Sequence, residues 1–557
     1  MANFLFPLLT TVASQVKNNF IQKTRRTSAV QEQFLLDLLF AYQNTELGRS
    51  YKIGEIKTIG QFRERVPVLP YSSYEPLCDR IAQGEQNILT NDPVVFLNLT
   101  SGSTGQKKLI PVTKKFQNSL RQANLTSIGF VHEALKSQGG KFGKLLATNS
   151  VQLIGTTSGG IDYGPASVGV LRMGKFVYEQ LFAHPYETLQ PADSLARHYL
   201  CLLFALANPN LRGIGANFPM LVLRICNYLE LYTEDLIRDL ETGKIASWLN
   251  LEPEFRATLE RQMVANPRRA KQLREIYKSF GILTPKLAWS NLSFVVTARG
   301  GTSDFYFERF ATYFGDTPGF GGVYSSAEGT FSINHALNTD GSILAIASGF
   351  FEFIPQDQWE TEHPQTLLAT EVKPGELYRI LVTNYSGFYR YDIGDVVEVV
   401  GFYEQAPLLI FRYRRGGLLS STTEKTTEFH VTQVMQELQQ KFSVFLEDFC
   451  ITLSDETIPP CYLVNIELAI GEVLEDHRSF LTAFDLLLQE THTSYAIKRP
   501  DPIPSPRLRV LAPGSFAIVR QRQLLKGIPD SQLKFPHIND DRHFLSGLKI
   551  EQEIKLD

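Results

Sequence analysis

The sequence predicts an α/β fold with one large domain and at least one smaller one. Short strands rich in β-branched residues, such as 292–298, alternate with long stretches of helical periodicity, such as 186–280, and this alternation is typical of an α/β sheet. The sequence Arg-Tyr-Arg-Arg-Gly-Gly at 412–417 then separates a strand-rich region from a last mixed region. A chain of 557 residues that is 43% hydrophobic is long enough to bury more than one core.

The predicted elements follow in order. The pattern is helical from about 10 to 90, where Pro67 and Pro70 impose extended backbone and Gly84 ends a later helix. A short buried strand at 94–97 is expected to lead through a glycine-rich loop into a helix. That helix spans 113–136, strands dominate 343–412, and the last region has a helix at 430–441, a strand at 460–468 and a helix at 477–490.

The composition excludes several classes of partner. There are 55 basic and 58 acidic residues, so the net charge of −3 provides no strong field to hold nucleic acid or an anionic membrane surface. Five scattered cysteines without a C-x-x-C pair argue against a zinc site and favour the reducing cytoplasm. No apolar run approaches the roughly 20 residues of a membrane span. The apolar stretch 4–13 is similar to a signal core, but no positive charge precedes it and Lys17 follows, so we expect an amphipathic first helix.

The first candidate site is a turn of hydroxyl and glycine residues at 99–108. Its glycines let the backbone approach an oxyanion, and its hydroxyls add hydrogen-bond donors. The spacing is not that of a Walker loop, and an ordinary Ser/Gly loop is the alternative. The residues that would cradle a phosphate are Ser101, Gly102, Ser103 and Thr104, with Lys107 and Lys108 beside them.

The second candidate is the segment 321–329, which combines an aromatic ring, two hydroxyls and a carboxylate. Tyr324 can stack on a flat base, with Ser325 and Ser326 beside it, and Glu328 can hold Mg²⁺, which prefers carboxylate oxygen. The alternative is a turn with a solvated glutamate.

The third candidate is Asp395, which follows a glycine and precedes an alternating strand. An exposed carboxylate at this position can accept two hydrogen bonds from a ribose diol. A hairpin turn is the alternative, because Gly-Asp before β-branched residues is a common turn sequence. Lys425 and Lys534, taken alone, can be solvated surface lysines.

In this order, the segments resemble the auxin-responsive Gretchen Hagen family of acyl-acid amido synthetases, which belong to the acyl-adenylate-forming enzymes. The resemblance covers nearly the whole chain. The matching blocks are 66–68, 80–84, 100–111, 324–328 with Asn334, 351–355, 389–402, 419–420 with Lys425 and Glu428, 514–516 and 532–536.

The resemblance implies a large N-terminal domain of β-sheets and flanking helices at 1–418. A smaller, mobile α/β C-terminal domain at 419–557 would close over the site about a hinge near 413–425. It also implies ATP and Mg²⁺ as cofactors. Lys425 and Lys534 would neutralise charge on the α-phosphate or the adenylate. Further implied roles are phosphate binding by Ser101, Ser103 and Thr104, adenine contact by Tyr324 and its neighbours, Mg²⁺ binding by Glu328 and ribose binding by Asp395.

The chain also departs from the plant pattern. Its first loop, Thr-Ser-Gly-Ser-Thr-Gly, is closer to general acyl-CoA synthetases than to the plant Ser-Ser-Gly-Thr-Ser, so the acceptor of the acyl group stays open. Asp392 stands where the plant enzymes have an arginine, and the order of residues around Tyr324 differs slightly.

The expected activity is adenylation of a carboxylic acid followed by transfer of the acyl group to an amine, most simply an amino acid, with release of pyrophosphate and AMP. One alternative is a synthetase that forms an acyl-CoA or another thioester. The other is a non-catalytic sensor of an acyl acid or nucleotide. We expect a monomeric cytoplasmic enzyme that acts on small molecules; the sequence identifies neither the acid nor the amine.

Overall fold

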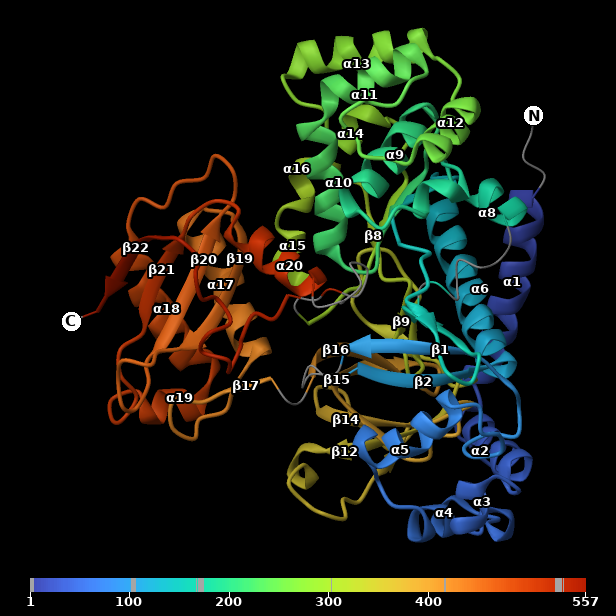
Figure 1. The fold of residues 1–557 in the computed structure, drawn as a ribbon. Coiled ribbons are helices and arrows are strands. Elements are labelled where there is room, and N and C mark those ends of the chain that lie inside the picture. Colours follow the sequence, from blue (N-terminus) through green and yellow to red (C-terminus); the bar gives the residue numbers. More distant parts are fainter. Residues whose placement is uncertain are drawn as a thin grey trace. The chain divides into compact units, whose positions relative to one another are not determined.

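The computed structural model describes residues 5–101, 107–166, 168, 175–301, 303–414, 417–525, 533 and 535–556. The chain forms two compact units, which we describe separately (Figure 1). Unit 1 comprises Met1–Arg299 and Phe310–Ile410, and unit 2 comprises Gly300–Arg309 and Phe411–Asp557. Both units mix helices with sheets, which confirms the α/β fold with a large N-terminal and a smaller C-terminal part.

Unit 1 begins with the predicted helices. The fourth of them ends at Arg65, because Pro67 holds the preceding Val66 in extended backbone. The fifth ends at Ala82, and Gly84 then turns the chain with a φ of +99°, in the region that favours glycine. The five helices are α1 (Leu5–Thr24), α2 (Thr27–Tyr42), α3 (Glu46–Ser50), α4 (Ile59–Arg65) and α5 (Tyr71–Ala82).

The glycine-rich loop lies between two strands, and the predicted strand-loop-helix order is wrong. β1 (Val94–Ser101) pairs antiparallel with β2 (Lys107–Thr113), and only then does α6 (Lys114–Ser137) begin, capped by the Thr113 hydroxyl. The sequence analysis did not predict β2, because Pro111 argues against a strand. β2 tolerates this proline as the edge strand of a sheet ordered β2-β1-β5-β4, completed by β4 (Gly155–Thr156) and β5 (Asp162–Gly164).

An eight-stranded antiparallel sheet forms the centre of unit 1, in the order β13-β12-β14-β15-β16-β11-β10-β9. Its strands occupy the region 323–414, which confirms the predicted strand-rich segment. Almost every side chain of β10, β12 and β14 is buried, since both faces of the sheet are covered. The bounds are β9 (Val323–Ser325), β10 (Thr330–Asn334), β11 (Ser342–Leu344), β12 (Phe350–Pro355), β13 (Leu367–Leu368), β14 (Leu377–Thr383), β15 (Tyr391–Tyr403) and β16 (Ala406–Arg414).

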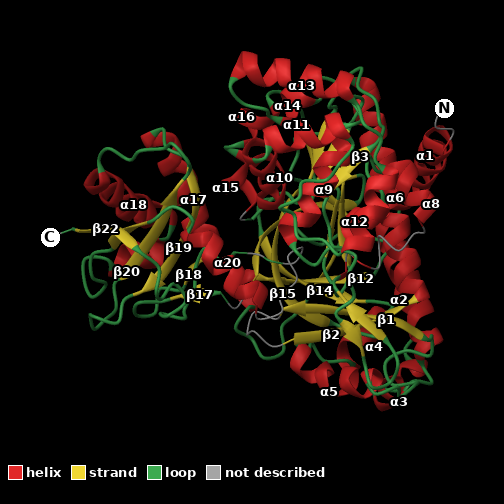
Figure 2. Ribbon diagram, turned by 45° about the horizontal axis from the view of Figure 1, so that its top comes forward, coloured by secondary structure: helices red, strands yellow, loops and turns green. Residues whose placement is uncertain are grey.

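A second sheet of unit 1 is parallel, with the order β3-β6-β7-β8. Its strands are β3 (Leu145–Ala147), β6 (Gly213–Gly215), β7 (Phe294–Val296) and β8 (Gly319–Phe320). Helices gather around it (Figures 1 and 2). They are α8 (Lys175–Leu181), α9 (Ser194–Leu206), α10 (Pro219–Leu231), α11 (Thr233–Thr242), α12 (Pro253–Gln262), α13 (Pro267–Phe280), α14 (Pro285–Ala288) and α16 (Phe310–Phe314).

Unit 2 is built on a four-stranded mixed sheet, ordered β19-β20-β21-β22, and a short ladder of β17 and β18. The predicted helices at 430–441 and 477–490 and the strand at 460–468 are confirmed as α17, α18 and β20. The bounds are α15 (Ser303–Phe307), β17 (Leu418–Leu419), β18 (Thr426–Thr427), α17 (Glu428–Phe442), β19 (Leu446–Leu453), β20 (Tyr462–Leu468), α18 (His477–Thr491), α19 (Thr493–Lys498), β21 (Arg507–Leu511), α20 (Ser515–Leu525) and β22 (Ile550–Lys555).

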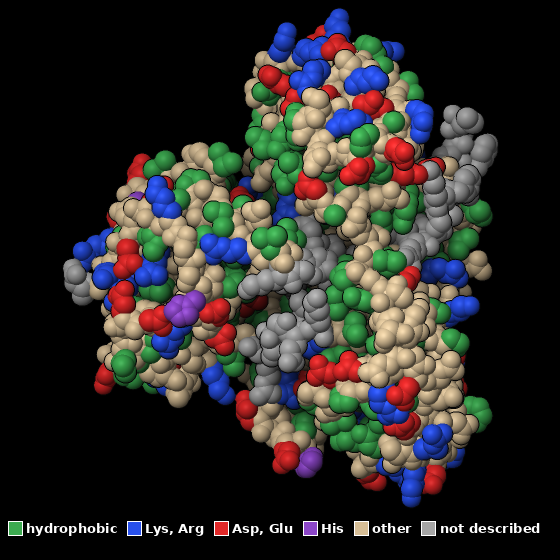
Figure 3. Space-filling view, viewed as in Figure 1, with side chains coloured by type: hydrophobic (Ala, Val, Ile, Leu, Met, Phe, Trp, Pro, Cys, Tyr) green, Lys and Arg blue, Asp and Glu red, His purple; other side chains and the backbone are tan. Residues whose placement is uncertain are grey.

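The surface and the cysteines fit the composition. On the face drawn in Figure 3, basic and acidic side chains are interspersed, as their near-equal numbers lead one to expect. All five cysteines are buried thiols without a disulfide. Among the helices that the structure describes, none has the length and apolar character needed to cross a membrane.

Candidate functional site

The second predicted segment forms the turn between β9 and β10. Tyr324 lies on β9 with its ring stacked on Phe331, at a centroid distance of 5.0 Å and an interplanar angle of 26°. Ser325 ends the strand with an exposed side chain. The turn closes because the Ser326 amide donates to the Gly329 carbonyl, at 2.8 Å, and the Ser326 hydroxyl accepts from the amide that follows two residues later, at 3.1 Å.

Tyr324 joins the second predicted segment to the third. Its phenolic hydroxyl donates to the Asp395 carboxylate, with 2.5 Å between the oxygens. The structure corrects two expectations about Asp395. The strand β15 begins at Tyr391, so Asp395 lies within it, and the carboxylate is buried, with only 1% of the residue exposed. A carboxylate held by a tyrosine within a strand is not the exposed turn residue that the sequence indicated.

Glu328 is buried as well, so the alternative of a solvated glutamate is wrong. Only 1% of the residue is exposed, and one carboxylate oxygen accepts a hydrogen bond from the Tyr391 hydroxyl at 3.3 Å. Its carbonyl oxygen accepts from the Asn384 side chain at 2.5 Å. The glutamate is thereby fixed between the turn and the start of β15.

Asn98 joins the strand that precedes the first predicted segment to the same turn. It lies on β1, is 5% exposed and donates from its side-chain nitrogen to the carbonyl of Ala327, at 2.9 Å. The strand that leads into the glycine-rich loop is therefore fixed against the turn that carries Glu328. No pattern in the sequence pointed to Asn98, Asn384 or Tyr391, because each acts through a partner far away in the chain.

The loop residues Gly102, Ser103 and Thr104 lie outside the described residues. The backbone of Ser101 ends β1, opposite Lys107 at the start of β2. The predicted phosphate cradle therefore connects two adjacent strands, one of which is positioned by Asn98.

A buried ionic network holds β15 near the site, and sequence reasoning did not find it. Arg390 and Glu352 are 5% and 1% exposed, and Arg390 Nε lies 2.9 Å from the Glu352 carboxylate. Arg390 also donates to the Val66 carbonyl at 2.9 Å, and Arg63 supplies a second cation 3.0 Å from Glu352. Asp392, which departs from the plant pattern, pairs with Arg379 at 3.2 Å.

The two predicted lysines belong to unit 2. Lys425 is exposed, and its backbone amide donates to the Ser420 hydroxyl at 2.8 Å. Lys534 lies outside the described residues. Its neighbours Leu533 and Phe535 are buried, and Phe535 packs edge-on against Phe516 at 4.8 Å.

Glu328 can contribute one carboxylate ligand to Mg²⁺. Within the described ranges, histidine, cysteine and acidic side chains nowhere form a group of three that could hold a metal ion. This donor set fits an ion such as Mg²⁺, which is commonly held by one or two carboxylates together with waters and substrate phosphates.

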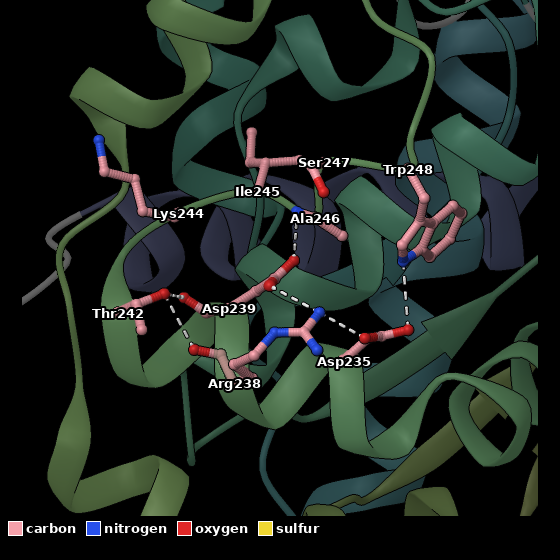
Figure 4. Close-up of a pocket in the computed structure, with 9 residues that line it drawn as sticks. All are labelled: Asp235, Arg238, Asp239, Thr242, Lys244, Ile245, Ala246, Ser247 and Trp248. Atoms are coloured by element: carbon pink, nitrogen blue, oxygen red, sulfur yellow. Dashed lines mark hydrogen bonds and ion pairs between the residues drawn. The ribbon is translucent and has the colours of Figure 1, made fainter.

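A pocket of about 450 Å³ lies elsewhere in unit 1, beside α11 (Figure 4). Arg238 lies between Asp235 and Asp239 and pairs with both, and Trp248 donates to Asp235 at 3.2 Å. The pocket contains none of the predicted site residues, and its arginine is already neutralised. The candidate site described here is therefore the β9–β10 turn and its contacts, not this pocket.

Sequence models of the GH3 family match most of the chain. Its N-terminal domain matches residues 16–319, its central domain residues 342–414 and its C-terminal domain residues 429–543. The chain is 26% identical over 553 residues to the jasmonoyl--L-amino acid synthetase JAR4 of Nicotiana attenuata, covering 94% of this chain and 93% of the relative. It is also 26% identical over 562 residues to the indole-3-acetic acid-amido synthetase GH3.8 of Oryza sativa subsp. indica, covering 95% and 92%.

Solved structures share the fold. The acyl acid amido synthetase AtGH3.15, in complex with 2,4-DB, is 22% identical, with a TM-score of 0.87 over 98% of each chain. A 2-hydroxyisobutyryl-CoA ligase in the postadenylation state is 13% identical, with a TM-score of 0.57 over 93% of this chain and 90% of that one. These likenesses show that the chain shares the fold of these two enzymes. Since the N-terminal domain of the family alone matches more than half of the sequence, the chain belongs to the GH3 family.

Proposed function

We propose that this protein activates a carboxylic acid with ATP and joins it to an amino acid through an amide bond. It is an amido synthetase, as are the two curated relatives described above, which it matches over nearly their full length. In the first half-reaction the acid's carboxylate oxygen attacks the α-phosphorus of ATP. The bond to the β-phosphate breaks and pyrophosphate leaves. In the second, the amine nitrogen attacks the acyl carbon, loses a proton and displaces AMP.

One observation supports the proposal: hydrogen bonds in unit 1 join the strand that leads into the glycine-rich loop, the β9–β10 turn and β15. Asn98 fixes β1 to the β9–β10 turn, and the Tyr324 hydroxyl fixes β9 to Asp395 on β15. A glycine-rich loop, an aromatic ring and a carboxylate would suit the phosphates, the base and the ribose of one ATP molecule.

We assign roles to these residues on that basis. Ser101, Gly102, Ser103 and Thr104 would donate to the phosphates, and Asp395 would accept from the ribose hydroxyls. Adenine would lie against Tyr324, whose position is fixed by its stacking on Phe331, with Ser325 and Ser326 beside it. Donors that are in place before the reaction stabilise developing charge without having to reorganise.

Glu328 is the residue that we propose for Mg²⁺. When bound, the ion would neutralise charge on the phosphate oxygens. The chain's own contribution is to hold Glu328 in place, because Tyr391 donates to its carboxylate and the Asn384 side chain donates to its backbone carbonyl.

Lys425 and Lys534 would neutralise the α-phosphate or the adenylate from the C-terminal part of the chain. We propose that residues 419–557 form a lid that turns about 413–425 between the half-reactions. Closure would also keep water from the reactive mixed anhydride.

We further propose that the protein is a monomer in the cytoplasm, a compartment that keeps five unpaired thiols reduced.

The acceptor separates this proposal from its rivals. The protein would be incubated with ATP, Mg²⁺ and each member of a panel of aryl and alkyl acids, in the presence of either pooled amino acids or CoA. Mass spectrometry would then identify the products. An acyl amide formed only with amino acids supports the proposal. A thioester formed only with CoA would contradict it in favour of a thioester-forming synthetase, and binding of ATP or acid without any product would favour a sensor.

A further inference from the structure

The loop that carries Lys425 is tightly constrained. β17 and β18 form a two-stranded ladder in which Leu419 pairs with Thr426, so the loop between them closes a short hairpin. Lys425 ends this loop with a φ of +58°, in the left-handed region. A residue with a Cβ pays an energetic cost for this conformation and keeps it only where its surroundings determine it.

Glu424 supplies that constraint from the buried side of the loop. Only 2% of the residue is exposed, whereas the next residue, Lys425, is exposed. The Glu424 carboxylate accepts from the backbone amides of Ser421 and Thr422, at 2.5 and 2.9 Å. It also accepts from the hydroxyls of Thr422 and Tyr462, at 2.9 and 2.6 Å. One carboxylate thus binds the start of the loop to its end.

Tyr462 connects this arrangement to the central sheet of unit 2. It lies on β20, is fully buried, and its hydroxyl lies 2.7 Å from that of Thr426. The Ser421 hydroxyl adds a bond to the Pro460 carbonyl, at 2.6 Å. Burial raises the pKa of Glu424, but the hydrogen bonds from Tyr462 and the backbone amides outweigh burial and lower it below 4.5, so the carboxylate is ionised at neutral pH.

We infer that Glu424 is a positioning residue, which holds Lys425 in its left-handed conformation and so presents the ammonium group to the phosphate. The inference rests on the proposed function, because it gives Glu424 no role except through Lys425. The Glu424 carboxylate accepts hydrogen bonds from backbone amides and so fixes the path of the loop backbone. These hydrogen bonds are strong, because hydrogen bonds to an ionised carboxylate are stronger than those between neutral groups. Because the buried Glu424 directly precedes the exposed Lys425, the backbone of the lysine has little freedom to change its conformation.

A double-mutant cycle tests the inference. AMP release would be measured for the full chain with Glu424→Gln, Lys425→Ala and the double variant, together with the KM for ATP. We expect Glu424→Gln to lower kcat by roughly tenfold, the scale of one hydrogen bond to a charged group, with little change in KM. In the Lys425→Ala background the same substitution should have almost no further effect, because coupled residues are not additive.

Controls separate positioning from stability. Glu437→Gln makes the same chemical change on an exposed side chain of α17 and should leave kcat unchanged. Tyr462→Phe removes one donor to Glu424 while keeping the ring, so it tests the inference even if Glu424→Gln fails to fold. It should lower kcat in the wild-type background only.

The outcomes are distinguishable. Additive losses from Glu424→Gln and Lys425→Ala would overturn the positioning role and leave the proposed function intact. Full activity of Glu424→Gln together with impaired activity of Lys425→Ala would also overturn the positioning role and leave the proposed function intact. Full activity of Lys425→Ala would remove Lys425 from the proposed mechanism and the inference with it.

Discussion

The phenolic oxygen of Tyr324 lies 2.5 Å from a carboxylate oxygen of Asp395, and this contact joins two segments that are 71 residues apart in the chain. It fixes the aromatic ring proposed for the base against the carboxylate proposed for the ribose. A loss of this hydrogen bond should therefore loosen the site without removing either group.

Tyr324→Phe tests that relationship. The ring and its stacking on Phe331 are kept, but the hydrogen bond to a charged group, worth about 1.5–3 kcal/mol, is lost. We expect the KM for ATP to rise by roughly tenfold or more. Tyr42→Phe is the matched control, because the Tyr42 hydroxyl also donates to a carboxylate, that of Asp92 at 2.9 Å, and neither residue has a proposed role in binding ATP. An equal rise in KM for both variants would contradict the assignment.

Glu328→Gln tests the proposed Mg²⁺ ligand. The amide keeps the shape of the side chain and can still accept from Tyr391, but it lacks the negative charge that a hard cation requires. The Mg²⁺ concentration that gives half-maximal pyrophosphate release should rise by roughly tenfold or more, as expected when a charged ligand is lost. Glu371→Gln, near the far edge strand of the same sheet, serves as control. An unaltered Mg²⁺ titration in Glu328→Gln would remove it from the metal site.

Arg390→Met tests the ionic network under β15. Among the described residues, removal of Arg390 leaves the buried Glu352 carboxylate paired with Arg63 alone, and breaking a buried pair commonly costs about 3–5 kcal/mol. We expect a clear fall in the thermal unfolding midpoint by calorimetry. Arg25→Met breaks an exposed pair with Glu404 and should change it little. Restoration of stability by a second change, Glu352→Leu, would support the buried charge as the cause, whereas equal midpoints for the wild type and Arg390→Met would contradict it.

His184 should make unit 1 less stable at acid pH. Burial lowers its pKa from 6.5 to about 4, outweighing hydrogen bonds to backbone groups that act in the opposite direction. Between these values the unfolded chain binds a proton that the folded chain does not. The contribution of His184 to the free energy of unfolding is therefore fully present above about pH 6.5 and falls as the pH is lowered towards 4. The loss between about pH 7 and pH 5 should be roughly 2 kcal/mol, at about 1.4 kcal/mol per pKa unit.

Denaturant unfolding of the wild type and His184→Asn at both pH values measures this contribution. The variant should lose less stability than the wild type, and His363→Asn, which changes an exposed histidine, should follow the wild type. Equal losses in the wild type and His184→Asn would show that another group is responsible.

Local patterns predicted the elements that depend on local chemistry. Pro67 and Gly84 mark the ends of helices because proline and glycine restrict or permit backbone conformations by themselves. β2 was missed because the tolerance for Pro111 depends on its position at the edge of the sheet, which no local pattern reveals. The predicted loop-to-helix order failed for the same reason.

The site was predictable only in part. Tyr324, Glu328 and Asp395 were chosen for chemistry that their side chains carry, and the structure brings them together. The burial of Glu328 and Asp395 was not predicted, since it depends on residues far away in the chain, as the contact of Asn98 with Ala327 across 229 residues illustrates. The same holds for Arg390 and Glu352, which look like ordinary charged residues until the fold buries them as a pair.

The central claim is that one site in this chain forms an acyl-adenylate from ATP and a carboxylic acid. Exchange of labelled pyrophosphate into ATP measures that reversible step directly and needs no acceptor. The account predicts exchange that requires both Mg²⁺ and an acid from the panel, that proceeds without an amino acid, and that is strongly reduced in Asp395→Ala. Exchange that is independent of any acid, or that is undiminished in Asp395→Ala, would contradict it.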